Sequence, residues 1–345
     1  MPDSAPPLPL PVLVILVLIG LPLPLFAAES KEVQFAGHGG FELGGTLLLP
    51  DEMSEGGAPA LLLLPGSGPT DRDGNQPPML VTDLLASVAE HLAAQGVATL
   101  RFDKRAAHVH LEHILELEVD EQNEFLSWDS FVGDAAAGLA FLRRAEGVDS
   151  TRVGILGHSE GGLIALQVAK DLGGGQGGVG ALVLAATPSE TLADVLREQV
   201  ARQISSLPEE LQKKFLAELD RAIAAVLETG TVPEDLAPGL RALFPPNATK
   251  LLEVELALEP TVLAVEYPGP VLVLQGESDV QVKAASAGKL ADALRSRETG
   301  RCEVLLVPSA SHNFKHVESE SDFGFQGPVV PAALEGLSAW LGREL

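Results

Sequence analysis

The sequence predicts an α/β protein with a mostly parallel central sheet, helices on both faces and a helical cap insertion. Three observations carry this prediction. Short apolar runs alternate with segments of helical spacing over most of the chain. Some of these runs are apolar throughout, which is typical of strands that are covered on both faces. One long interval, residues 187–267, holds no such run.

The predicted elements follow in βα order after an N-terminal pair of antiparallel strands. Strands are predicted at residues 33–35, 41–49, 60–64, 97–102, 152–156, 180–186, 270–275 and 302–307. Helices are predicted at 80–94, 130–144, 163–170 and 331–341, where apolar residues recur every three or four positions. Residues 187–267 show helical spacing only, and we therefore expect them to form a cap inserted between two core strands.

Composition narrows the function classes. The chain has 345 residues, is 46% hydrophobic and carries a net charge of −25. The length and apolar content suffice for one large domain, assigned to residues 29–345. The strongly acidic balance argues against binding to nucleic acid or to an anionic membrane surface. Cys302, the single cysteine, excludes an intramolecular disulfide and a cysteine-based zinc cage, and its place in a strand predicts an unreactive thiol.

The N-terminal segment is expected to lie outside the fold. An apolar run at residues 12–21 is followed by Ala27 and Ala28, and charge begins only at Glu29. This pattern predicts a secretory signal peptide over residues 1–28, either cleaved near Ala28 or kept as an anchor. The protein is therefore expected to be exported to the periplasm or the medium, with no membrane insertion beyond this segment. The segment departs from the usual pattern, since it lacks lysine and arginine.

A glycine-flanked serine joins a predicted strand to a predicted helix. Gly157, Ser159 and Gly161 form the Gly-x-Ser-x-Gly pattern of a nucleophile elbow. In such a turn the serine is strained and its hydroxyl projects above the edge of the sheet. Ser159 is therefore the candidate nucleophile, the alternative being a glycine-rich turn with an inert serine.

A serine nucleophile needs a base and an acid that orients it. Asp279 and His312 follow the next two core strands after the cap, at the sheet edge where open α/β folds build their sites. The order serine, aspartate, histidine fits this type of elbow. Glu277 and His316 stay open as alternatives for the acid and the base.

A tetrahedral intermediate also needs two backbone N–H donors. One is expected from Glu160, directly after the candidate nucleophile. The other is expected from Ser67, in the loop after strand 60–64, where Gly66 would allow a close backbone approach. A plain turn without such a role is the alternative.

Three segments carry a family resemblance. They are Pro65–Asn75, Asp103–Arg105 and Gly157–Gly162, which read PGSGPTDRDGN, DKR and GHSEGG. With them the chain resembles the α/β-hydrolase superfamily over residues 33–343, and more narrowly bacterial exported serine esterases. The resemblance implies the α/β-hydrolase fold, a carboxylesterase for short or medium acyl groups, a small-molecule ester substrate, and no cofactor or metal. The spacing from Gly276 also resembles the acid loop of these enzymes, which favours Asp279.

One segment departs from that resemblance. Residues 106–110 replace the glycine turn that usually follows the Asp-Lys-Arg motif, so this loop is expected to take another path. This loop brings His108, His110 and His113 close together in the sequence. Their imidazole side chains are of the type that binds zinc or copper. A loop without metal is the preferred interpretation.

Other functions stay open at this point. An amidase, a peptidase or a thioesterase would use the same three side chains. In an aminopeptidase, Glu160, Asp71 or Asp73 could hold the substrate amine, although Asp71 and Asp73 are expected mainly to brace their loop. A third interpretation is a non-catalytic acyl-binding protein. The presence of Ser159, Asp279 and His312 together argues against it.

Overall fold

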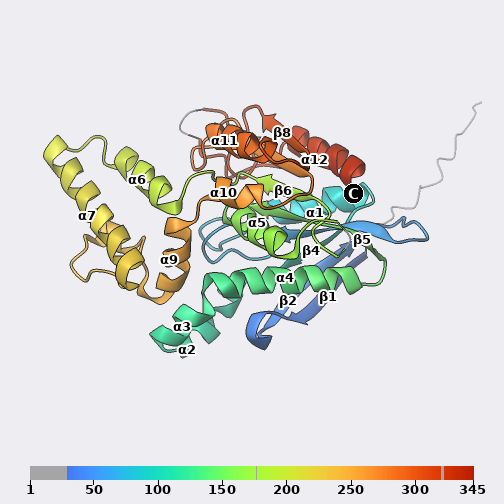
Figure 1. The fold of residues 1–345 in the computed structure, drawn as a ribbon, viewed down its shortest axis with the longest axis horizontal. Coiled ribbons are helices and arrows are strands. Elements are labelled where there is room, and N and C mark those ends of the chain that lie inside the picture. The colour runs from blue at the N-terminus through green and yellow to red at the C-terminus, as the bar shows by residue number, and fades with distance from the viewer. Residues whose placement is uncertain (1–28, 176, 320–321) are drawn as a thin grey trace, which may run out of the picture.

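A single eight-stranded sheet forms the centre of the computed structural model, which describes residues 29–175, 177–319 and 322–345 (Figure 1). The strand order is β1-β2-β4-β3-β5-β6-β7-β8. β2 pairs with β1 and β4 in antiparallel fashion, and all other neighbours are parallel, which confirms the predicted sheet. The strands are β1 Glu29–Ala36, β2 Glu42–Leu49, β3 Ala58–Leu64, β4 Ala98–Phe102, β5 Val148–His158, β6 Leu182–Ala185, β7 Val271–Gly276 and β8 Cys302–Val307.

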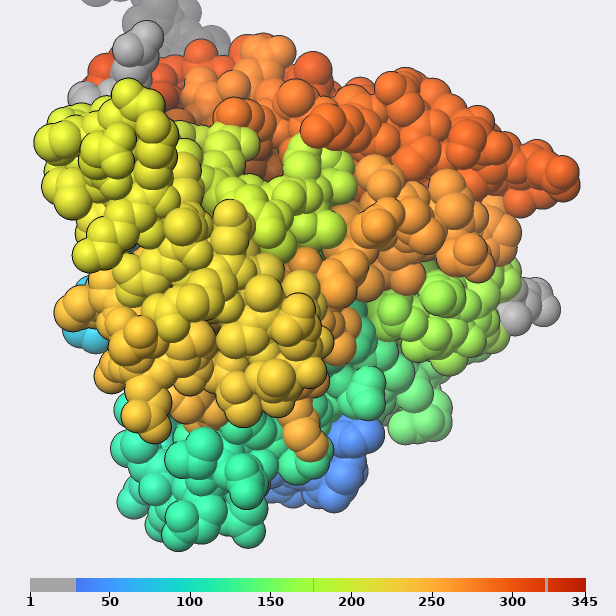
Figure 2. All heavy atoms as spheres, turned by 60° about the vertical axis from the view of Figure 1, so that its left-hand side comes forward, coloured from blue at the N-terminus to red at the C-terminus, as the bar shows by residue number. Residues whose placement is uncertain are grey.

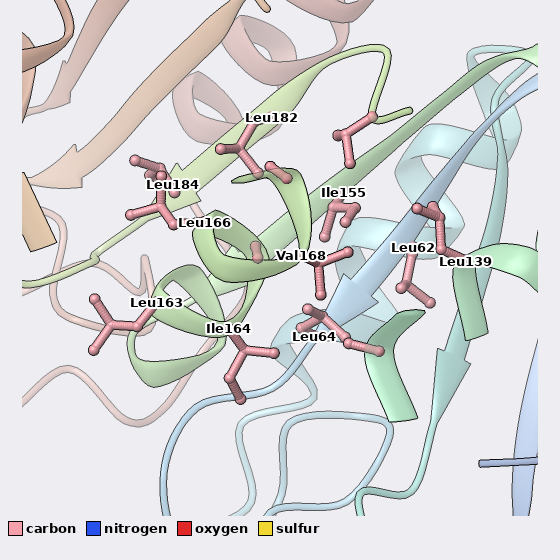
Figure 3. Close-up of a cluster of buried hydrophobic side chains, with 14 of the residues drawn as sticks. Leu62, Leu64, Leu139, Ile155, Leu163, Ile164, Leu166, Val168, Leu182 and Leu184 are labelled. Atoms are coloured by element: carbon pink, nitrogen blue, oxygen red, sulfur yellow. The ribbon is translucent and has the colours of Figure 1, made fainter. Parts of the chain in front are cut away.

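Alternating side chains of the central strands fill two hydrophobic cores. In β3, Leu62 and Leu64 belong to one core, whereas Leu61 and Leu63 belong to the other. All four are at most 2% exposed. Each such leucine contributes about 1.5–3 kcal/mol by leaving water. Figure 3 shows the first core, where residues of α5 meet Leu62 and Ile155 of the sheet.

Helices cover both faces of the sheet. α4 and α5 pack on the first core, and α1 and α12 pack on the second. The core helices are α1 Leu84–Ala94, α4 Trp128–Arg144, α5 Glu160–Leu172, α11 Ala284–Arg295 and α12 Pro331–Glu344.

The chain between β6 and β7 forms helices throughout. They are α6 Leu192–Gln203, α7 Glu209–Thr229, α8 Pro238–Arg241, η3 Pro246–Ala248, α9 Thr249–Ala257 and α10 Pro260–Val265. A hydrophobic cluster of its own, including Leu219, Ile223 and Phe244, holds α6, α7 and α9 together. α6, α7 and α9 stand to one side of the sheet in Figure 1 and contribute to a yellow-to-orange surface in Figure 2, whereas α10 packs on the first core.

Three segments differ from the sequence-based expectation. The helix α11 between β7 and β8 was not predicted. The helix predicted from residue 80 begins at Leu84, because the side chain of Asn75 accepts hydrogen bonds from the backbone of Thr82 and Asp83. Residues 106–113, expected to lie in a loop, include η2 His108–His110 and the start of α2 Leu111–Glu116, and α3 Val119–Phe125 follows them. One further turn, η1 His38–Gly40, joins β1 to β2.

The predicted signal segment, residues 1–28, lies outside the described residues. Among the described helices, none combines the length and apolar character that a membrane span needs.

Candidate active site

Ser159 occupies a sharp turn between β5 and α5. Its backbone has φ 55° and ψ −120°, a conformation that costs a non-glycine residue about 1–3 kcal/mol. The two flanking glycines explain how the turn closes. A Cβ at Gly161 would lie 2.6 Å from the Leu64 carbonyl oxygen, and one at Gly157 would collide with the carbonyl of Gly161. The predicted Gly-x-Ser-x-Gly elbow therefore has the required backbone shape.

Asp279 and His312 meet at the ends of β7 and β8. The Nδ1 atom of His312 lies 2.7 Å from Oδ2 of Asp279, and both residues are 6% exposed. Oδ1 of Asp279 accepts hydrogen bonds from the backbone N–H groups of Gln281 and Val282. Burial alone would raise the pKa of Asp279, but these bonds and the one from His312 hold it below its ordinary value. The carboxylate is thus kept ionised beside the imidazole.

The structure separates the preferred residues from their alternatives. Glu277 and His316 are both exposed. The hydrogen-bonded pair is formed by Asp279 and His312 instead. A further side chain that the sequence did not single out, Gln275, donates to Oδ2 of Asp279 at 3.0 Å. Asp279 is therefore bound on both of its oxygens.

One small cavity brings the predicted residues together. It measures about 60 Å³, and Ser159, His312, Gly66 and Ser67 line it together with Gln76, Asn313, Leu85 and others. Gln281 also lines it, and the same residue borders a second cavity of about 150 Å³ between α6 and α11. Gln281 therefore lies between the cavity beside Ser159 and the one beside α6.

His158 supports the site from inside the sheet. Its Nε2 lies 2.9 Å from the backbone carbonyl of His312. Burial, followed by the nearby imidazole of His312, lowers the pKa of His158 to about 3. The ring is therefore neutral at ordinary pH and donates its Nε2–H to that carbonyl. This contact fixes the backbone that carries His312, a role that the sequence did not reveal.

Charged side chains brace the loop after β3. Arg72 binds Asp103 through Nε and Nη2, and Arg101 pairs with Asp73. Asp71 accepts hydrogen bonds from the backbone N–H groups of Asp73 and Asn75, which form an Asx turn. Asp71 and Asp73 thus hold the loop in shape.

Lys104 joins this loop to the turn at Ser159. Its Nζ donates to the Gly66 carbonyl at 2.8 Å and lies 3.2 Å from Oε1 of Glu160. Lys104 is 5% exposed and Glu160 is 7% exposed, so the ion pair is buried. In the sequence, only the charged run Asp103–Arg105 at the end of an apolar strand pointed to this contact. It did not show that Gly66 and Glu160 are the partners of Lys104.

Among the comparisons with known proteins, only the one with solved structures finds a match. No family profile and no curated sequence matches the chain. Solved structures do match over most of its length. A hypothetical protein of Pseudomonas aeruginosa is 18% identical with a TM-score of 0.56, covering 94% of this chain and 96% of that one. The fold is that of the α/β-hydrolases.

Two other structures with this α/β-hydrolase fold are named after an enzymatic activity. An esterase of Pyrococcus furiosus is 15% identical, with a TM-score of 0.55 and coverage of 92% of this chain and 91% of that chain. A puromycin-hydrolyzing peptidase of Mycobacterium tuberculosis is 19% identical, with a TM-score of 0.57. It covers 94% of this chain and 41% of the peptidase. At such identities the likeness establishes the α/β-hydrolase fold alone.

The three histidines of residues 108–113 do not form a metal cluster. His110 and His113 place their rings 5.1 and 5.3 Å from the ring of Phe41. Burial lowers the pKa of His110, which favours its neutral form. Within the described parts of this α/β-hydrolase fold, no group of three or more potential metal ligands occurs. Aromatic packing accounts for the placement of His110 and His113.

Proposed function

We propose that the protein is a serine hydrolase that cleaves carboxylic esters with short or medium acyl groups. Ser159 would be the nucleophile, His312 the general base and then the general acid, and Asp279 the carboxylate that orients His312. The backbone N–H groups of Ser67 and Glu160 would form the oxyanion hole.

The first half-reaction forms an acyl-enzyme. Oγ of Ser159 attacks the ester carbonyl carbon while Nε2 of His312 takes its proton. The N–H groups of Ser67 and Glu160 stabilise the negative oxygen of the tetrahedral intermediate. His312 then returns the proton to the departing alcohol oxygen, and the carbon–oxygen bond of the ester breaks.

The second half-reaction releases the acid. Water loses a proton to His312 and attacks the acyl carbon through a second tetrahedral intermediate. When this collapses, Ser159 leaves and regains its proton from His312. One ester and one water thus give one acid and one alcohol.

The observation that carries this proposal is the shared cavity. It is lined by a strained serine at a strand–helix turn and by a buried histidine whose Nδ1 is bound to Asp279. Because Nδ1 is occupied, Nε2 is the nitrogen left for proton transfer.

An ester substrate is favoured over the amine-terminated substrate of an aminopeptidase. The three carboxylates that the sequence offered for an amine are already engaged within the protein. Asp73 pairs with Arg101, Asp71 forms an Asx turn and Glu160 pairs with Lys104. A free amine would have to displace one of these contacts.

The proposal predicts that Ser159→Ala abolishes ester hydrolysis. We expect the full chain to hydrolyse p-nitrophenyl esters, tested from acetate to palmitate, and the variant to lose at least about 10³-fold in kcat. Ser296→Ala changes an exposed serine after α11 and serves as the matched control. No hydrolysis above the Ser159→Ala background on any ester would contradict the proposal. Faster turnover of the matching p-nitroanilides would instead indicate an amidase or peptidase.

A further inference from the structure

The buried pair of Lys104 and Glu160 needs an explanation beyond stability. Removing two charges from water costs several kcal/mol per ion, so a buried ion pair is weak evidence for a stabilising role. This pair lies directly behind the turn at Ser159, since Glu160 is the first residue of α5. Its position next to the reacting serine suggests a role in the site.

We propose that Lys104 is a positioning residue that orients the oxyanion hole, an inference that rests on the proposed function. In a trans peptide group the C=O and the following N–H point in opposite directions. Lys104 Nζ holds the carbonyl of Gly66 at 2.8 Å, and the N–H of the same peptide belongs to Ser67. Fixing the carbonyl toward Lys104 therefore turns the Ser67 N–H to the opposite side.

The peptide between Gly66 and Ser67 lies beside the serine. A Cβ built on Gly66 would lie 3.3 Å from Cβ of Ser159, and Gly66 and Ser67 line the cavity with Ser159. Hydrogen bonding of the ammonium to the carbonyl also polarises the peptide, which makes its N–H a stronger donor. Without Lys104 the peptide could rotate and take its N–H away from the substrate oxygen.

The same ion pair reaches the second donor. The backbone N–H of Glu160 is the other proposed oxyanion contact, and the side chain of Glu160 binds Lys104. One buried contact thus connects the two peptide groups that would hold the oxyanion. The centre of the Phe131 ring in α4 lies 5.2 Å from Nζ, so the ammonium also makes a cation–π contact.

A carboxyl group of the helical insertion faces this pair. Glu255 of α9 is 8% exposed, and its side chain makes no hydrogen bond or ion pair with the residues that the structure describes. Besides burial, the charges of Glu160 and Lys104 act on its pKa. The inserted helices therefore place a carboxyl group within electrostatic range of this pair.

The test compares kcat and KM of the full chain for p-nitrophenyl butyrate. Lys104→Met should lower kcat about 10- to 100-fold with KM within threefold, because the lost interaction acts in the transition state. The double variant Lys104→Met/Glu160→Gln avoids an unpaired buried carboxylate and should show the same loss. Lys104→Arg keeps a cation that can reach the carbonyl and should recover much of kcat.

The control is the neighbouring buried ion pair. Arg105→Met breaks the contact of Arg105 with Asp134, at 2.6 Å, without touching the loop at Gly66, and should keep kcat within threefold in its folded fraction. The inference is overturned if the double variant keeps wild-type kcat, if its loss lies in KM alone, or if Lys104→Arg is no better than Lys104→Met. Wild-type activity equal to that of Ser159→Ala would overturn the proposed function and this inference together.

Discussion

Single buried side chains in this protein hold other residues in place. His158 binds the backbone of His312, Gln275 binds Asp279, and Lys104 binds Gly66. The placement of Ser159, Asp279 and His312 at one edge of the sheet could be predicted because each follows an apolar strand in the sequence. Their supporting residues could not, because a sequence does not show which buried polar groups meet. The loop carboxylates Asp71 and Asp73 were predictable as bracing groups from the turn residues around them.

Asp279→Asn tests the orientation of His312. We expect kcat to fall about 10³- to 10⁴-fold, because the amide disfavours the tautomer that presents Nε2 as the base. KM should change little. Glu277→Asn alters the exposed alternative acid and should keep kcat within threefold. Equal effects of the two substitutions in the ester assay would contradict the assignment of Asp279.

Short turns and helix ends decide how the elements place the site. The turn from β5 to α5 was predictable because its glycine spacing is local. The start of α1 was not, since the Asn75 side chain caps the preceding residues from outside the helix. α2 and α3 also escaped prediction, because such short helices are too brief to show a clear apolar period.

Gly157→Ala tests the close contact in the β5–α5 turn. A Cβ there collides with the backbone of Gly161, which cannot move without opening α5. We expect a loss of about 3 kcal/mol in the free energy of unfolding, measured with urea, at the upper end of overpacking effects. Gly288→Ala in α11 is the control, since its Cβ meets nothing within 4 Å and should leave stability equal or higher. Equal stabilities for the two variants would refute this account.

Glu255 makes the stability of the inserted helices depend on pH. Burial and the nearby Glu160 raise its pKa well above the ordinary 4.5, so the folded state holds a proton that the unfolded state releases. Stability attributable to this group is present at low pH and falls as pH rises above about 4.5, by at most about 1.4 kcal/mol per unit. Glu255→Gln should therefore gain stability over wild type as pH rises.

Urea unfolding of both proteins between pH 5 and 8 measures this difference. Glu259→Gln alters an exposed carboxylate just after α9 and should follow the wild-type curve. A constant gap between wild type and Glu255→Gln at every pH would show that Glu255 does not change its protonation on unfolding.

The whole molecule combines a layered sheet with a helical insertion that has a hydrophobic cluster of its own. The order of strands and helices was predictable because apolar runs and helical spacing repeat along the chain. The electrostatic interaction of Glu255 in α9 with Lys104 and Glu160 was not, because it joins segments that are far apart in the sequence through buried charges. Long-range packing of this kind leaves no periodic pattern in a sequence.

The separate hydrophobic cluster of α6, α7 and α9 has a consequence for how such a protein can diversify. Substitutions inside that cluster can reshape the inserted helices while the sheet keeps its own two cores intact. The outer surface of the molecule can therefore change by drift in these helices alone, provided that Glu255 and its neighbours are kept. A randomised library confined to these helices would measure whether they influence the selectivity of the proposed hydrolase.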